Sequence, residues 1–69
     1  MTDSLGEALP REMARVRDTI MPAYQSIGTS GMPALFLMRR SLDAAAKAMA
    51  EGDVVAMIAA YKDLKGYEL

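Results

Sequence analysis

The sequence predicts an all-α fold, a small three-helix domain that ends in an antiparallel αα-hairpin. Ala, Met and Leu, which are strong helix formers, are abundant, whereas β-branched residues are few. Apolar residues recur at steps of three and four in three segments, and breaks that contain Gly separate these segments. The chain has 69 residues, the size of a single domain, so residues 1–69 are expected to form one unit.

The first predicted helix runs from about residue 10 to residue 27. Pro10 suits the first position of a helix, because the N–H group that proline lacks would have no partner there. An alternative start lies earlier, where Ser4 and Glu7 have the spacing of a capping box, although Pro10 would then fall in the second turn. The apolar face of this helix is formed by Met13, Val16, Ile20, Tyr24 and Ile27.

Two features interrupt the first half of the chain. Pro22 lies inside the first helical segment, where it removes a backbone hydrogen bond. It is expected either to kink the helix or to divide it near Met21. The sequence Gly-Thr-Ser-Gly at residues 28–31 then predicts a loop.

The second predicted helix covers residues 32–50. Its apolar face is formed by Leu35, Met38, Leu42, Ala45 and Met49. Its outer face carries charges of alternating sign at successive i,i+4 positions, namely Arg39, Asp43, Lys47 and Glu51. Such pairs stabilise a helix by a few tenths of a kcal/mol each, so we expect this face to be solvated.

The third predicted helix covers residues 54–65. Gly52 suits the end of the preceding helix, and Asp53 suits the N-cap of this one. Its apolar face is formed by Val54, Met57, Ile58, Tyr61 and Leu64. Because the connection is so short, the last two helices should pack side by side in opposite directions.

Charge and hydropathy exclude several classes of protein. Eight basic and nine acidic residues give a net charge of −1, which provides no overall attraction to nucleic acid or to an anionic membrane. The longest apolar run, residues 32–38, is far shorter than the roughly 20 residues that span a bilayer. Asp3 and Glu7 precede any basic residue, unlike a secretory signal. We therefore expect a cytoplasmic protein that does not bind membranes.

The residue types also argue against catalysis. The chain has no Cys and no His, so it lacks thiolate ligands, the commonest metal ligand and the commonest general base. Ser and Thr hydroxyls have no His to activate them, and the carboxylates of Asp43 and Glu51 have Lys47 between them. The sequence predicts no enzyme, no catalytic residue, no metal site and no cofactor.

The surplus of apolar residues is the most informative feature for function. Hydrophobic residues make up 52% of the chain, and seven of them are Met, a side chain common at adaptable binding surfaces. The run at residues 32–38 is apolar on every side of a helix. Either the first helix covers several sides of it, or it presents an interface to a second copy or to another protein. The predicted interface residues are Met32, Phe36, Leu37, Met38 and Val55. The leading hypothesis is a small protein–protein interaction or oligomerisation module.

The alternative hypothesis is weak binding of nucleic acid or another anion. It depends on a patch formed by Arg11, Arg15, Arg39 and Arg40, if the fold brings these side chains together. No aromatic platform for stacking bases accompanies the arginines, and acidic residues lie among them. Nucleic acid is therefore the less favoured partner.

The chain also resembles short bacterial, phage-related helical proteins of unknown function. The resemblance covers most of the chain and is carried by LPREMARVRD at residues 9–18, MPAY at 21–24 and AYKDLKG at 60–66. It implies a bacterial or phage origin. It transfers no activity and no site residue.

Overall fold

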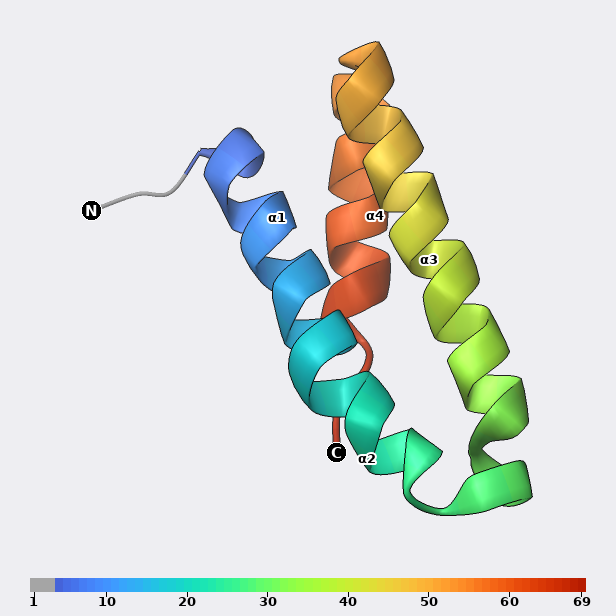
Figure 1. Ribbon diagram of the computed structural model, residues 1–69. Helices are drawn as coiled ribbons and strands as arrows, with labels where there is room; N and C mark the ends of the chain where they lie inside the picture. Colours follow the sequence, from blue (N-terminus) through green and yellow to red (C-terminus); the bar gives the residue numbers. More distant parts are fainter. Residues whose placement is uncertain (1–3) are drawn as a thin grey trace.

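The computed structural model describes residues 4–69 and is helical throughout its regular structure (Figure 1). Among these residues there is no strand, which confirms the all-α prediction. In order, the elements are α1 (Leu5–Arg15), a π-helical turn η1 (Val16–Ile20), α2 (Met21–Gln25), a 3₁₀ turn η2 (Gly28–Gly31), α3 (Met32–Glu51) and α4 (Val54–Lys65).

The first helix begins at the alternative, earlier start. Ser4 is its N-cap residue and Leu5 its first residue, so Pro10 lies inside the helix and the predicted start at residue 10 is wrong. The Ser4 side chain makes no capping hydrogen bond, so the capping box is not formed either. Packing favours the early start, because Leu9, which precedes Pro10 in this helix, is fully buried in the core.

Pro22 is accommodated by a local change of helix type. The chain stays helical from α1 through η1 to α2, and the N–H of Met21 donates to the carbonyl oxygen of Val16, the five-residue spacing of a π-turn. The new α-helix starts at Met21 with Pro22 in its first turn, where the missing N–H costs little. The expected irregularity near Met21 is confirmed, but the helix ends at Gln25, so Ile27 lies beyond it.

The C-terminal hairpin matches its prediction closely. Helices α3 and α4 have almost the predicted bounds and lie side by side in opposite directions. Gly52 ends α3 in the left-handed conformation, with φ of 66°, which glycine adopts without steric cost. Asp53 then caps α4, because its Oδ1 accepts a hydrogen bond of 3.1 Å from the N–H of Ala56.

Helix α4 lies between α1 and α3 and packs against both (Figure 1). The chain is thin in one direction, with principal extents of 35, 25 and 15 Å. The buried core cluster is formed by Leu9, Val16, Ile20, Met21, Leu35, Met38, Ala45, Ala60 and Leu64. Because α1 packs on the other side of α4 and contacts α3 only weakly, it does not cover the side of α3 that faces away from the core.

Candidate interaction surface

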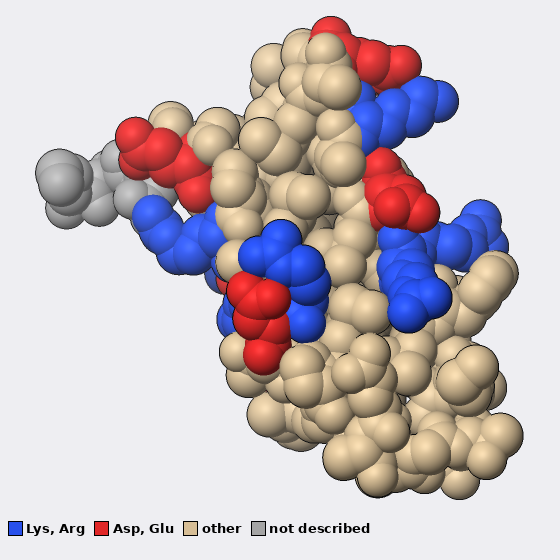
Figure 2. All heavy atoms as spheres, viewed as in Figure 1, with Lys and Arg blue, Asp and Glu red and all other residues tan. Residues whose placement is uncertain are grey.

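One end of the molecule is formed largely by an uncharged stretch of the chain. Between Asp18 and Arg39 the chain has no Lys, Arg, Asp or Glu. These residues, 19–38, form α2, η2 and the start of α3, and we call this region the uncharged end. In Figure 2 the corresponding lower part of the surface shows no charged side chain.

Large apolar side chains are exposed at the uncharged end. Phe36 is 63% exposed, and Met32 and Leu37 are each more than half exposed. We call these three residues the apolar patch. Met38, which the sequence placed with them, is only 1% exposed and belongs to the core, so its assignment to an interface is wrong. Met38 lies on the opposite side of α3, where it packs with Leu64 and its neighbours in the core cluster.

Phe36 and Met32 flank a shallow hollow on the outer side of α3. Met32, Leu35, Phe36 and Arg39 line it, and its volume is about 130 Å³. The guanidinium carbon of Arg40 lies 6.0 Å from the centroid of the Phe36 ring, at the outer limit of a cation–π contact. Phe36 therefore has both Arg39 and Arg40 as neighbours.

Leu37 faces a different direction from Phe36. It lines an open groove of about 410 Å³ between α3 and the end of α4, together with Arg40, Ser41, Ala44, Asp63 and Tyr67. The Ser41 and Tyr67 hydroxyls form a hydrogen bond of 2.9 Å there. The apolar patch thus extends over two adjacent sides of α3.

Val55 does not join the apolar patch. It is 78% exposed, but it lies in the first turn of α4, at the tip of the hairpin. The stretch of α3 from Phe36 to Glu51 separates the two places by about 22 Å at the usual helical rise. Val54 and Ile58, which were predicted to be core, are also exposed at this tip because α1 does not cover it.

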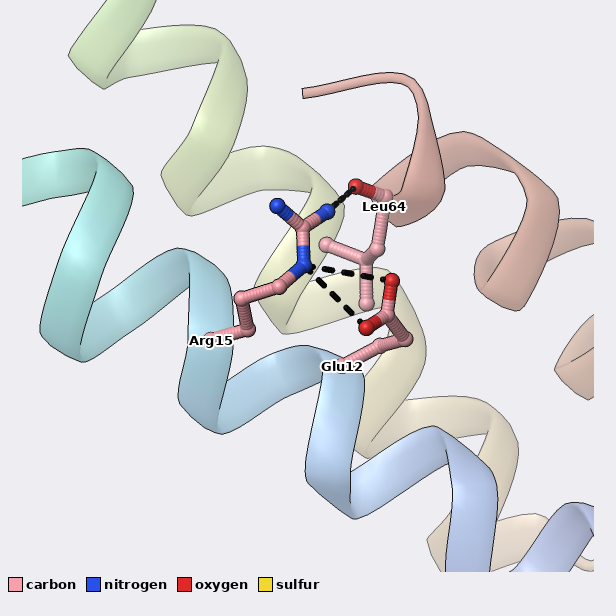
Figure 3. Close-up of polar contacts among 3 residues, drawn as sticks. All are labelled: Glu12, Arg15 and Leu64. Carbon is pink, nitrogen blue, oxygen red and sulfur yellow. Dashed lines mark hydrogen bonds and ion pairs between the residues drawn. The ribbon is translucent and has the colours of Figure 1, made fainter. Parts of the chain in front are cut away.

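Arg15 has a structural role rather than a place in an anion site. Its Nη2 donates a hydrogen bond of 3.0 Å to the carbonyl oxygen of Leu64, in the last turn of α4 (Figure 3). Its Nε lies 3.1 Å from Oε2 of Glu12, one turn earlier on α1. The guanidinium therefore joins α1 to the carbonyl end of α4, where a positive charge is favoured.

The predicted arginine patch is divided by the fold. Arg11 and Arg15 lie on α1, whereas Arg39 and Arg40 lie on α3, and α4 lies between these two helices. In Figure 2 the basic side chains over α1 and those over α3 occupy opposite sides of the view, with uncharged surface between them. This view shows no single basic surface made by all four residues.

Residues 4–69 contain neither a cluster of metal-ligating side chains nor a membrane-spanning helix. No group of three or more His, Cys, Asp or Glu side chains is placed to hold a metal ion there. None of the helices in this range is long and apolar enough to cross a membrane.

No protein-family profile, curated protein or solved structure matches this chain. The resemblance to short bacterial and phage-related proteins therefore stays a prediction.

Proposed function

We propose that this protein is an interaction module that binds another protein chain through the apolar patch. The observation that carries the proposal is the exposure of Phe36, at 63%, beside the exposed side chains of Met32 and Leu37 at the end of the uncharged stretch 19–38. Aromatic side chains are enriched among the residues that dominate binding energy, and Met adapts its shape to a partner. The proposal assigns no catalytic residue and no cofactor.

The size of the patch limits what it can do alone. Fully burying a large apolar side chain contributes about 1.5–3 kcal/mol, and each of these three is already partly buried, so together they offer about 4 kcal/mol. Association itself costs at least about that much in lost freedom of motion. A stable complex therefore needs further contacts around Phe36.

The arginine hypothesis has less support. Arg15 is engaged by Leu64 and Glu12, and the remaining arginines are divided between α1 and α3. Binding to DNA or RNA at low ionic strength that weakens as salt is added would support the arginine hypothesis.

The test of the proposed function is the variant Phe36→Asp. A buried carboxylate at this position would be strongly unfavourable in a complex, whereas on the exposed surface of the free chain it costs little. We expect the variant to keep its helical circular dichroism, to lose self-association by light scattering, and to lose any protein that the wild-type chain captures.

The matched control is Val55→Asp, the same chemical change on another exposed apolar residue. It should leave assembly and capture unchanged. If Phe36→Asp behaves like Val55→Asp in both measurements, the apolar patch is not a binding surface.

A further inference from the structure

The outer side of α3 has the spacing of a coiled-coil seam. Its residues recur at steps of four and three along the whole helix and point away from the buried side that carries Met38 and Ala45. All of them are exposed. We call this set the outer seam; it consists of Met32, Phe36, Arg39, Asp43, Ala46 and Ala50. Alternating steps of three and four are what two packed helices require of each other.

The chemistry of the outer seam changes in order along the helix. Large apolar side chains come first, a cation and an anion lie in the middle, and small Ala side chains come last. If a second α3 runs in the opposite direction, Met32 faces Ala50, Phe36 faces Ala46, and Arg39 faces Asp43. All three pairs are centred on residue 41, so a single register satisfies them together.

We propose that two copies of this chain form a symmetric dimer by antiparallel packing of their α3 helices along the outer seam. The inference rests on the proposed function and names its partner as a second copy. Two-fold symmetry repeats each of the three pairs, as an isologous interface requires. The large side chains of one helix then lie over the small ones of the other, which permits an interaxial distance of about 8–10 Å.

Charge complementarity supports a second copy as the partner. Within residues 4–69, neither Arg39 nor Asp43 takes part in an ion pair, although both are exposed on the outer seam. In the dimer each would meet the opposite charge of the other copy, giving two ion pairs beside the axis. Another protein would have to reproduce the apolar, charged and small positions in the same order.

The flanks of the outer seam set the expected affinity. Half-buried Leu42 lies on one flank near the two-fold axis and adds apolar contact. Arg40 lies on the other flank, where the Arg40 side chains of the two copies approach each other and their like charges weaken the dimer. The seam is about 27 Å long, so the contact is smaller than the roughly 800 Å² per partner of a typical stable complex. We expect a dissociation constant of about 1–100 μM.

The test is a charge exchange within the outer seam. Arg39→Asp and Asp43→Arg each place like charges opposite each other twice, so each should weaken the dimer at least about tenfold. The double variant R39D/D43R restores opposite charges in the same register and should recover wild-type dimerisation. Sedimentation equilibrium from about 1 μM to about 1 mM covers the expected range.

Two controls accompany this test. Circular dichroism should show equal helicity in all variants, because even a formed i,i+4 pair of opposite charges stabilises a helix by only about 0.2–0.5 kcal/mol. Val55→Asp, a substitution at the tip of the hairpin rather than on the outer seam, should leave the dimer intact.

The outcomes separate this inference from the proposed function. A wild-type chain that is monomeric up to about 1 mM overturns the dimer. A double variant as weak as the single variants overturns the register, as does a dimer that no charge variant affects. If Phe36→Asp abolishes assembly or capture while the charge variants do not, the proposed function stands and the proposed register of the dimer fails. If Phe36→Asp changes neither, both proposals fail.

Discussion

Single side chains join the helices of this chain, and Arg15 is the clearest case. Its guanidinium binds the carbonyl oxygen of Leu64 and the carboxylate of Glu12. The variant Arg15→Met keeps most of the aliphatic stem but leaves both oxygens without that partner. We expect it to lower the free energy of unfolding by about 1 kcal/mol, which the urea midpoint at fixed protein concentration would measure.

The ion pair of Arg17 is exposed to solvent, unlike the contacts of Arg15. Arg17 donates two hydrogen bonds to the neighbouring carboxylate of Asp18, and its Nε lies 2.9 Å from Oδ1. These hydrogen bonds lower the pKa of Asp18 and raise the pKa of Arg17. Both groups are exposed, so solvent screens the pair and Arg17→Met should leave stability at neutral pH unchanged. Because the pKa of Asp18 is lowered, any contribution is present above its unfolded-state pKa and is lost as the pH falls through the folded one. An Arg17→Met variant as destabilised as Arg15→Met would show that the contact with Leu64 is not what matters.

At the scale of elements, the junction between η2 and α3 depends on Gly31. This residue is buried, and a Cβ atom built on it would overlap the carbonyl oxygen of Tyr24 and press on the side chain of Ile27. Because backbone atoms cannot move aside cheaply, Gly31→Ala should lower the free energy of unfolding by about 2 kcal/mol. The measurement is again the urea midpoint.

Gly6→Ala is the matched control for that variant. Gly6 lies in α1, where a Cβ atom would lie 3.9 Å from Oγ of Ser4, an ordinary contact distance, so alanine should be neutral or stabilising by up to about 1 kcal/mol. Equal destabilisation by the two substitutions would contradict the close approach at Gly31.

The elements were predictable where local signals decide them. Gly52 and Asp53 fix the hairpin through their own backbone and capping preferences, and both α3 and α4 have nearly the predicted bounds. The start of α1 was not predictable in this way, because Pro10 favours a start that the burial of Leu9 outweighs. Packing between distant parts of the chain is not visible in local sequence.

At the scale of the whole molecule, the packing of the helices decides which residues form the candidate surface. Periodicity cannot separate core from surface in residues 32–38, since every one of them is apolar or Pro; only the packing of α3 puts Met38 inside and Phe36 outside. The i,i+4 charges of α3 were visible in the sequence. Their use in an interface emerges only when the outer side of α3 is seen to be uncovered.

The proposed dimer also predicts how the stability of the whole molecule responds to concentration. Only a few large side chains are fully buried, namely Leu9, Val16, Met38 and Leu64, so an interface would supply a large share of the stability of so small a fold. If folding and dimerisation are coupled, each tenfold rise in concentration adds about 1.4 kcal/mol per dimer and raises the Tm by about 4–5 °C. Differential scanning calorimetry above the dissociation constant should show this rise for the wild type and for R39D/D43R. It should be absent for Arg39→Asp at concentrations below the weaker dissociation constant of that variant, because a monomer unfolds at a temperature that does not depend on concentration. A flat wild-type response would mean that the chain folds without a second copy.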